Sequence, residues 1–485
     1  MKYVILPIFA AMLHHAWAFD VEMAGHLKTD QGRNRRAHSV LQNDTVNSFN
    51  GYLLGFEKVS RKRLFPAAKT VPDAQAMWSG KLARTVFDPS DQVTTFLESR
   101  RNDPHLAVPT HAVRLDGSSP APRETLFSVY DGTWAADYAE NRAVDRMWDE
   151  ISRMRAPLSR ALASGCYTHL VLLSMGWNTQ QDETILNARD MLREMRAAAR
   201  ANGESFNPLA VVVSWHSYWD LGMLGQILGG VPGRFSLKNK GNDVDEVAQT
   251  WLQHLLRDVL VPLKHRHNVP LVLIGHSLGA RCVTTAACSS WTVKKEGRAS
   301  DIDLVIALEG AFPVLRFLEA KAGAPETASR HGKRLVFDGF DRGARHFVFT
   351  SSSADESRKL APLTMLFTDF SPYALSAPGG RQMGRSPNFD HVKVSAPDLR
   401  RTASLLPSGH PAKPAVAVDA SGFIDGKVSC APGKQERVAT KLAKDQADNG
   451  DVTKRHGRSS AHSDIYDCEA GRFLAGCISR YAPSR

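Results

Sequence analysis

The pattern of hydrophobic positions changes near residue 126. From there on, short apolar runs of strand length alternate with stretches whose apolar residues recur every three or four positions. Strands and helices in alternation are typical of a mainly parallel sheet with helices on both faces. Because most runs are nearly continuous Val, Ile and Leu, we expect strands that are buried on both sides. The pattern therefore predicts an α/β fold.

The predicted strands share an aliphatic or β-branched run bounded by turn residues. They are expected at residues 126–130, 168–175, 209–215, 270–274, 303–308, 346–350 and 388–395. The predicted helices lie at residues 141–162, 182–201, 243–263, 277–289 and 468–480. We expect Pro157 to break or kink the first of these helices near its end.

Two regions depart from the alternation. Residues 19–120 are polar, basic and poorly periodic, which predicts an N-terminal extension of low order. Residues 402–458 are rich in Pro, Ala, Lys, Asp and Gly, which predicts an insertion or mobile loop inside a main domain at residues 121–485. The α/β domain is thus expected to lie behind the extension and to contain the insertion.

The first eighteen residues have the pattern of a secretory signal peptide. A lysine at position 2 is followed by an apolar stretch of h-region length and by small residues ending at Ala18. This pattern predicts a secreted or periplasmic protein, and the alternative is an apolar N-terminus that is not cleaved. No later segment reaches the ~20 apolar residues of a membrane span.

The formal net charge of +11 would suit nucleic acid or an anionic membrane. Much of the basic excess lies in the predicted extension, as in residues 33–36 and 60–63. We therefore predict no nucleic-acid partner, while contact with a membrane surface stays open. The six cysteines suit an exported protein, with Cys430, Cys468 and Cys477 as the disulfide candidates. No Cys or His spacing fits a zinc site, so we predict no metal and no cofactor.

Residues 270–281 carry the strongest chemical signal. A buried-strand run leads directly into Gly275-His276-Ser277-Leu278-Gly279, and a predicted helix follows. This strand–turn–helix setting is that of a nucleophile elbow, in which small residues two positions to either side let strand and helix approach. The helix N-terminus also favours negative charge developing at the serine. Ser277 is therefore predicted to be a nucleophile, because the alternative, a helix N-cap, does not explain both glycines.

With this motif, the chain resembles the α/β-hydrolase superfamily of serine esterases and lipase-like enzymes. The resemblance spans roughly residues 126–481. It rests on Gly176-Trp177-Asn178-Thr179 after one strand, Ser214-Trp215 after the next, and the Gly-His-Ser-Leu-Gly motif. It implies the α/β-hydrolase fold and catalysis by a serine, an acid and a histidine in that chain order.

The resemblance also implies an oxyanion hole made of two backbone amides. The first is the N–H of Leu278, directly after the nucleophile, and the second is that of Trp177. The sequence departs from the family at Met175, where a histidine is usual. The alternative role for Trp177 is that of a core aromatic residue.

Chain order then selects the acid and the base. Asp355 follows the strand at 346–350 in a serine-rich turn and is the predicted acid, unless it caps a helix. His462 lies shortly before the last helix and is the predicted base. The alternatives are Glu309, Asp341 and Asp369 for the acid, and His391 and His456 for the base.

Trp215, His216 and His276 are expected to line the substrate site. Residues 221–233 are apolar and glycine-rich, and they form either a mobile cap or a loop packed on the core. We expect hydrolysis of a carboxylic ester, of a small molecule or a lipid, through an acyl-enzyme. The alternatives are an acyltransferase with the same triad and a secreted binding protein on a degenerate hydrolase scaffold. The oligomeric state stays open.

Overall fold

The computed structural model describes the chain in twelve stretches. These are residues 49–85, 103–116, 124–130, 132–176, 179, 181–215, 240–288, 300–312, 343–355, 389–408, 415–425 and 465–484. The predicted signal peptide, His216, the apolar segment 221–233 and most of the predicted insertion lie outside the described residues. Among the described residues, no helix is both long and apolar enough to cross a membrane.

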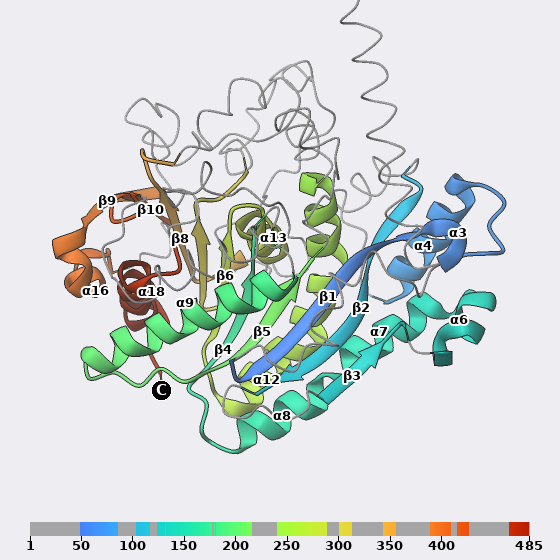
Figure 1. Ribbon diagram of the computed structural model, residues 1–485, viewed down its shortest axis with the longest axis horizontal. Coiled ribbons are helices and arrows are strands. Elements are labelled where there is room, and N and C mark those ends of the chain that lie inside the picture. The colour runs from blue at the N-terminus through green and yellow to red at the C-terminus, as the bar shows by residue number, and fades with distance from the viewer. Residues whose placement is uncertain are drawn as a thin grey trace, which may run out of the picture.

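A ten-stranded sheet forms the middle of the molecule (Figure 1), in the order β3-β2-β1-β5-β4-β6-β7-β8-β10-β9. Its strands are β1 (Gly51–Ser60), β2 (His105–Leu115), β3 (Glu124–Ser128), β4 (His169–Ser174), β5 (Pro208–Ser214), β6 (Leu271–His276), β7 (Leu304–Leu308), β8 (His346–Ser351), β9 (Phe389–Ser395) and β10 (Ala415–Gly422). The β1–β2 and β2–β3 pairs are antiparallel, and the other seven pairs are parallel. The carboxyl ends of the central strands therefore meet along one edge.

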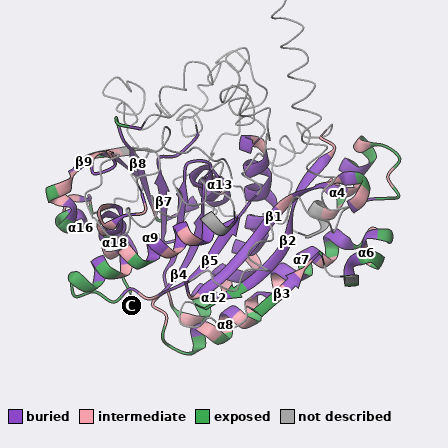
Figure 2. Cartoon of the chain, in the orientation of Figure 1, coloured by how far each residue is buried: buried purple, intermediate pink, exposed green. Residues whose placement is uncertain are grey.

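Helices cover both faces of this sheet. One face packs against α4 (Val71–Thr85), α7 (Ala143–Arg153), α8 (Arg155–Ala163), the π-helical turns η3 (Ala248–Leu252) and η4 (Leu255–Leu260), α12 (Val261–His267) and α13 (Leu278–Ala287). The other packs against α9 (Gln181–Ala201), η10 (Ala396–Arg401) and α18 (Cys468–Tyr481). Shorter helices are α3 (Arg61–Leu64), η2 (Gly132–Trp134), α6 (Ala135–Ala139) and α16 (Thr402–Leu405). Figure 2 shows the central strands buried between these layers.

The predicted α/β fold with a mainly parallel sheet is confirmed. Every predicted strand is present to within a few residues, as are the helices observed as α9, α13 and α18. The predicted helix at 141–162 is divided into α7 and α8 at Met154, three residues before Pro157. A proline early in α8 fits, because the first turn of a helix does not need its N–H.

The prediction of low order for residues 19–120 is wrong for two of its segments. Strand β1 is a buried strand inside the sheet, where Gly51–Gly55 pair in parallel with β5 and the whole strand pairs with β2. The polar residues of this region suggested exposure, but Lys58 of β1 is buried because it pairs with carboxylates from other parts of the chain. Its Nζ lies 2.7 Å from Asp243 Oδ1 and 3.1 Å from Asp103 Oδ2.

The predicted insertion at 402–458 also contains a strand of the sheet. Strand β10 lies between β8 and β9 and pairs in parallel with both. It consists of small and β-branched residues with a mostly buried pattern, a composition that resembles a loop when its neighbours are unknown. Residues 388–395 were predicted to be the last strand, but β10 follows them in the chain, and β9 (Phe389–Ser395) lies at the edge of the sheet.

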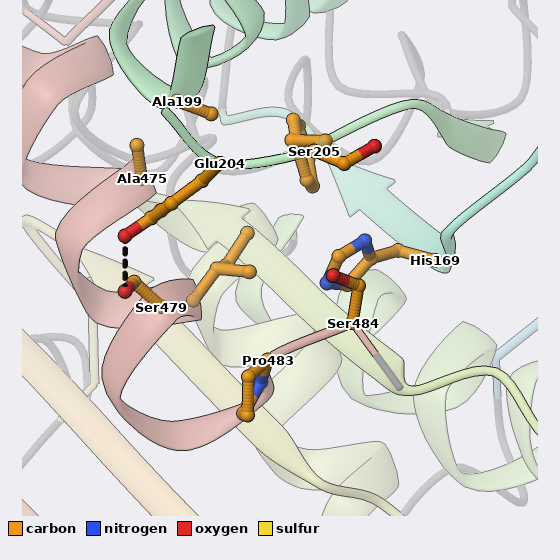
Figure 3. Close-up of a pocket in the computed structure, with 10 residues that line it drawn as sticks. His169, Ala199, Glu204, Ser205, Ala475, Ser479, Pro483 and Ser484 are labelled. Carbon is orange, nitrogen blue, oxygen red and sulfur yellow. Dashed lines mark hydrogen bonds between the residues drawn. The ribbon is translucent and has the colours of Figure 1, made fainter. Parts of the chain in front are cut away.

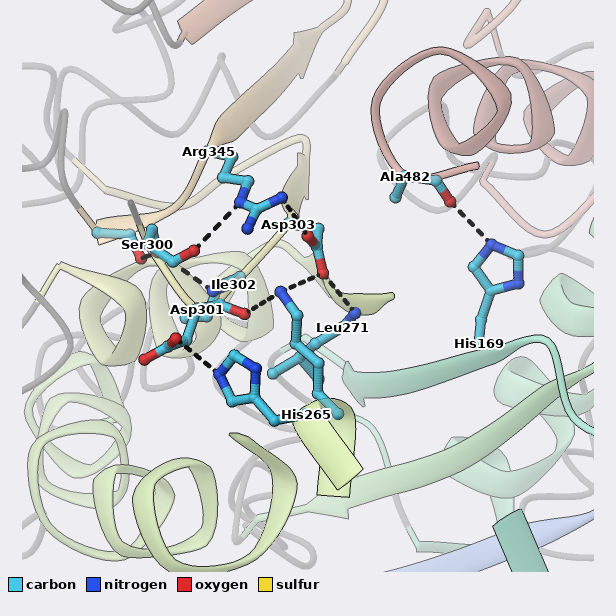
Figure 4. Close-up of polar contacts among 11 residues, drawn as sticks. His169, His265, Leu271, Ser300, Asp301, Ile302, Asp303, Arg345 and Ala482 are labelled. Carbon is cyan, nitrogen blue, oxygen red and sulfur yellow. Dashed lines mark hydrogen bonds and ion pairs between the residues drawn. The ribbon is translucent and has the colours of Figure 1, made fainter. Parts of the chain in front are cut away.

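Ion pairs to the buried Asp303 join the edge of the sheet where the parallel strands begin, opposite their carboxyl ends (Figure 4). Asp303 accepts hydrogen bonds from the backbone N–H of Leu271, at 2.8 Å, and from Lys264 Nζ, at 2.6 Å. Arg345 lies 3.3 Å from the other oxygen of Asp303. The starts of β6, β7 and β8 are thereby tied together.

Among the described cysteines, Cys468 is disulfide-bonded. Cys166, Cys282, Cys288 and Cys477 are not in disulfides. The disulfide prediction is therefore confirmed for Cys468 and wrong for Cys477, which is buried in α18. Cys430 lies outside the described residues.

Candidate active site

The turn between β6 and α13 holds Ser277 in a strained conformation. Ser277 has φ 55° and ψ −120°, although few residues other than glycine adopt a positive φ. It occupies the N-cap position of α13, but its side chain makes no capping hydrogen bond. The hydroxyl is therefore not used to cap the helix. Strain of this kind is characteristic of functional sites.

Two glycines of the turn make room for different neighbours. A Cβ on Gly275 would lie 2.4 Å from the carbonyl oxygen of Gly279, so this glycine lets strand and helix approach each other. A Cβ on Gly279 would lie 2.1 Å from the Ser174 oxygen and 2.6 Å from the Met175 oxygen. Gly279 thus admits the loop after β4, which is the predicted oxyanion loop.

The turn is also fastened to the neighbouring strand. The N–H of Ser277 donates to the Leu308 carbonyl at 2.9 Å, and the N–H of Ala311 donates to the Ser277 carbonyl at 3.0 Å. Leu278 opens α13, and the amides of a first helical turn have no partner inside the helix. The predicted first donor therefore lies directly beside the serine.

The loop after β4 reaches the serine through Gly176. A Cβ on Gly176 would lie 2.9 Å from the Ser277 Cβ and 3.2 Å from His276 Nδ1. The indole N–H of Trp215, directly after β5, donates to the Met175 carbonyl at 2.9 Å. Trp177, the predicted second donor, lies outside the described residues.

A side chain from the segment before α18 completes this side. The Tyr466 hydroxyl lies 3.3 Å from His276 Nδ1 and 3.7 Å from the Met175 sulfur. The Tyr466 and His276 rings meet edge to face, with centroids 6.0 Å apart. Sequence reasoning did not single out Tyr466, because nothing local shows that it touches a loop almost 300 positions earlier.

The predicted acid lies at the same edge of the sheet. Asp355 is buried and ends a turn after β8, in which its N–H donates to the Ser352 carbonyl at 3.3 Å. Its competitor Glu309 directly follows β7, with φ 46°. A carboxylate oxygen of Glu309 accepts a hydrogen bond from the Ser352 N–H at 3.0 Å. Glu309 therefore supports the turn that presents Asp355. Asp341 and Asp369 lie outside the described residues.

The predicted base His462 and its alternative His456 lie outside the described residues. Ile465, three residues after His462, is buried, and Asp467 caps α18 through two backbone amides, each 3.0 Å away. The other alternative, His391, is exposed on the edge strand β9. Since β9 is four strand positions from β6, it lies about 19 Å away at ordinary strand spacing. His391 is therefore a poor partner for Ser277.

A serine, a histidine and an aspartate are in contact on the helical face of the sheet, away from the predicted triad residues. His254 Nε2 is 3.0 Å from Ser152 Oγ, and its Nδ1 is 2.6 Å from Asp258 Oδ2. Ser152 is in the last turn of α7, where backbone amides bond to carbonyls one turn earlier. The same ring nitrogen of His254 also lies 3.0 Å from the Trp148 carbonyl. This arrangement has no amides for an oxyanion and serves to join two helices.

A buried thiol and a small hollow are not part of the candidate active site. Burial raises the pKa of the Cys282 thiol in α13, so this thiol is not a competing nucleophile. A hollow of about 100 Å³ lies beside His169, Glu204 and Ser479 (Figure 3). His169 begins β4, so the hollow is at the edge of the sheet opposite Ser277.

Comparisons with known proteins add two partial likenesses. No protein-family model and no curated protein sequence matches the chain. A phospholipase from Legionella pneumophila, solved with thio-NAD, shares 12% identity over 47% of this chain and 46% of its own, with a TM-score of 0.23. A thermophilic esterase from the planctomycete Thermogutta terrifontis shares 11% identity over 60% of this chain and 86% of its own, with a TM-score of 0.21. The chain is thus similar to both over part of its length, and it spans about half of the phospholipase.

Proposed function

We propose that the chain is a serine hydrolase that cleaves a carboxylic ester through an acyl-enzyme on Ser277. The observation that carries the proposal is the strained serine turn, whose hydroxyl is not used for capping and against which the loop after β4 is packed. Neither feature is needed for an ordinary helix start. Both are needed to present a nucleophile beside backbone donors.

The proposed reaction uses three side chains and two amides. His462 takes the Ser277 proton as the hydroxyl attacks the ester carbonyl, and the amides of Leu278 and Trp177 stabilise the oxyanion. The histidine then gives its proton to the leaving alcohol as the C–O bond breaks. Water, activated by the same histidine, releases the acid and restores Ser277. Asp355 holds the imidazole and stabilises its charged form.

The fixed start of α18 supports His462 as the base. Tyr466 lies against His276, the residue next to the nucleophile. His462 is three positions before the buried Ile465, and three extended residues span at most about 10 Å. This short connection to the start of α18 supports the assignment of His462 as the base.

A fluorophosphonate probe with a small nitrophenyl ester tests the proposal. The wild-type protein should bind the probe covalently at Ser277. The Ser277→Ala variant should take no label, and its kcat should be at least about 1,000-fold lower. Ser152→Ala is the matched control, because Ser152 also contacts a histidine but has no oxyanion donors. It should keep both labelling and activity.

Two results would contradict the proposal. Folded wild-type protein that takes no label and cleaves no ester would indicate a binding protein on a hydrolase scaffold. Labelling at Ser152 would mean that the nucleophile lies in α7 and that Ser277 is not the nucleophile. Faster acyl transfer to an added alcohol than to water would instead keep the residues and change the acceptor.

A further inference from the structure

The buried Trp215 side chain makes a hydrogen bond within the protein. Trp215 is 5% exposed, and its indole N–H donates to the carbonyl of Met175, a residue that is 2% exposed. The two residues come directly after the neighbouring parallel strands β5 and β4. A tryptophan buried in this way does not offer its N–H to a substrate.

The carbonyl that Trp215 holds belongs to the Met175–Gly176 peptide. On one side, a Cβ on Gly279 would lie 2.6 Å from the Met175 oxygen. On the other, Gly176 lies against Ser277, as its own would-be Cβ contact of 2.9 Å shows. The peptide plane is therefore enclosed between the serine turn and the indole ring. Rotating it would move Gly176 relative to the nucleophile.

We propose that Trp215 is a positioning residue that fixes the oxyanion loop by holding the Met175 carbonyl. This inference rests on the proposed function. Oxyanion donors act only when they are preorganised, because reorienting them during the reaction cancels their benefit. A buried carbonyl that loses its donor also costs free energy, which favours a peptide flip toward another partner. Tyr466 contacts the Met175 side chain, and so it cannot replace the hydrogen bond to the carbonyl.

The chain offers a matched control for removing an indole hydrogen bond. Trp251 is fully buried, and its N–H donates to the Ala107 carbonyl at 2.7 Å. Trp251 lies in η3, where its ring packs against those of Trp78 and Trp148 and its N–H bonds to β2 rather than to the loop after β4. Trp251→Phe therefore loses the same kind of contact without touching the proposed site.

The experiment compares Trp215→Phe and Trp251→Phe in the full chain, with a nitrophenyl ester as substrate. Both variants should lower the melting temperature. Trp215→Phe alone should lower kcat about 10- to 100-fold with KM unchanged, and should slow fluorophosphonate labelling of Ser277 to a similar degree. The pH at half-maximal kcat/KM should stay the same, since the base is untouched.

A second variant covers the case in which Trp215→Phe does not fold. Benzothienylalanine at position 215 keeps the ring shape and removes only the N–H donor. A kcat equal to that of the wild type in this variant would overturn the inference. So would a raised KM with an unchanged kcat, which would return Trp215 to the substrate wall, and so would equal losses in the Trp251→Phe control. A wild-type protein without esterase activity or label overturns the proposed function as well, which separates the two failures.

Discussion

At the residue scale, two positions of the serine turn must be glycine because neighbouring backbone atoms occupy the space that a Cβ would need. Gly275 faces the following helix, while Gly279 faces the oxygens of Ser174 and Met175. The motif predicted that glycine is needed at both positions, but not that the second one receives the oxyanion loop. That contact joins residues about a hundred positions apart, and local sequence contains no record of it.

Gly279→Ala should therefore damage the site more than the fold. The added methyl would lie 2.1 Å from the Ser174 oxygen, so the loop must move. We expect about 100-fold lower kcat from a displaced loop and a loss of about 1–3 kcal/mol in stability. Enzyme assays and thermal unfolding measure the two effects.

Gly80→Ala provides the control. Gly80 lies in α4, and apart from its chain neighbours and its own helix backbone no atom lies within 4 Å of the position that an alanine methyl would take there. Alanine at this position should leave activity unchanged and add up to about 1 kcal/mol of stability. Full activity in Gly279→Ala would show that the loop is not in close contact with the turn.

At the element scale, sequence patterns located the central strands that are apolar throughout, and missed β1, β2 and β10. Strands β4, β5 and β6 were predictable because nearly all of their own residues are apolar and buried. Strand β1 was missed because Lys58 is buried only through carboxylates that come from residues 103 and 243. Burying a paired charge depends on tertiary contacts, which hydrophobic periodicity does not record.

The same pairing gives a stability prediction for β1. Asp243→Asn leaves the Lys58 ammonium buried with one fewer carboxylate, which should cost roughly 3 kcal/mol. Asp145→Asn is the comparison, since the Asp145 side chain in its pair with Lys81 is 52% exposed. That change should cost less than about 1 kcal/mol. Equal losses in urea unfolding would mean that the Lys58 pair is not buried in solution.

At the scale of the whole molecule, the segment after α18 contacts the first residue of the central strand β4. His169, the first residue of β4, places its Nε2 2.9 Å from the Ala482 carbonyl just beyond α18. Figure 3 shows His169 beside residues of this C-terminal segment. Burial lowers the pKa of His169 to about 4, although the Ala482 carbonyl opposes the shift.

The His169 shift predicts acid sensitivity of the whole fold. The unfolded chain takes up a proton below about pH 6.5, whereas folded His169 resists protonation until about pH 4. Its contribution is therefore present above pH 6.5 and is lost as the pH falls toward 4, by about 3 kcal/mol in all. His169→Gln should flatten this part of the stability curve in urea titrations at pH 7, 6, 5 and 4. An unchanged slope would place the acid sensitivity elsewhere.

The position of β1 inside the sheet, between β2 and β5, has a consequence for synthesis of the protein. Gly51 pairs with Ala210, so β1 leaves the ribosome long before its parallel partner exists. Until β5 emerges, β1 is the unpaired edge of the unit formed by β1, β2 and β3, and such an edge invites pairing with other chains. Chaperones that hold nascent chains should therefore act on this protein before residue 214 is translated, and folding should be slow because a distant contact completes the sheet.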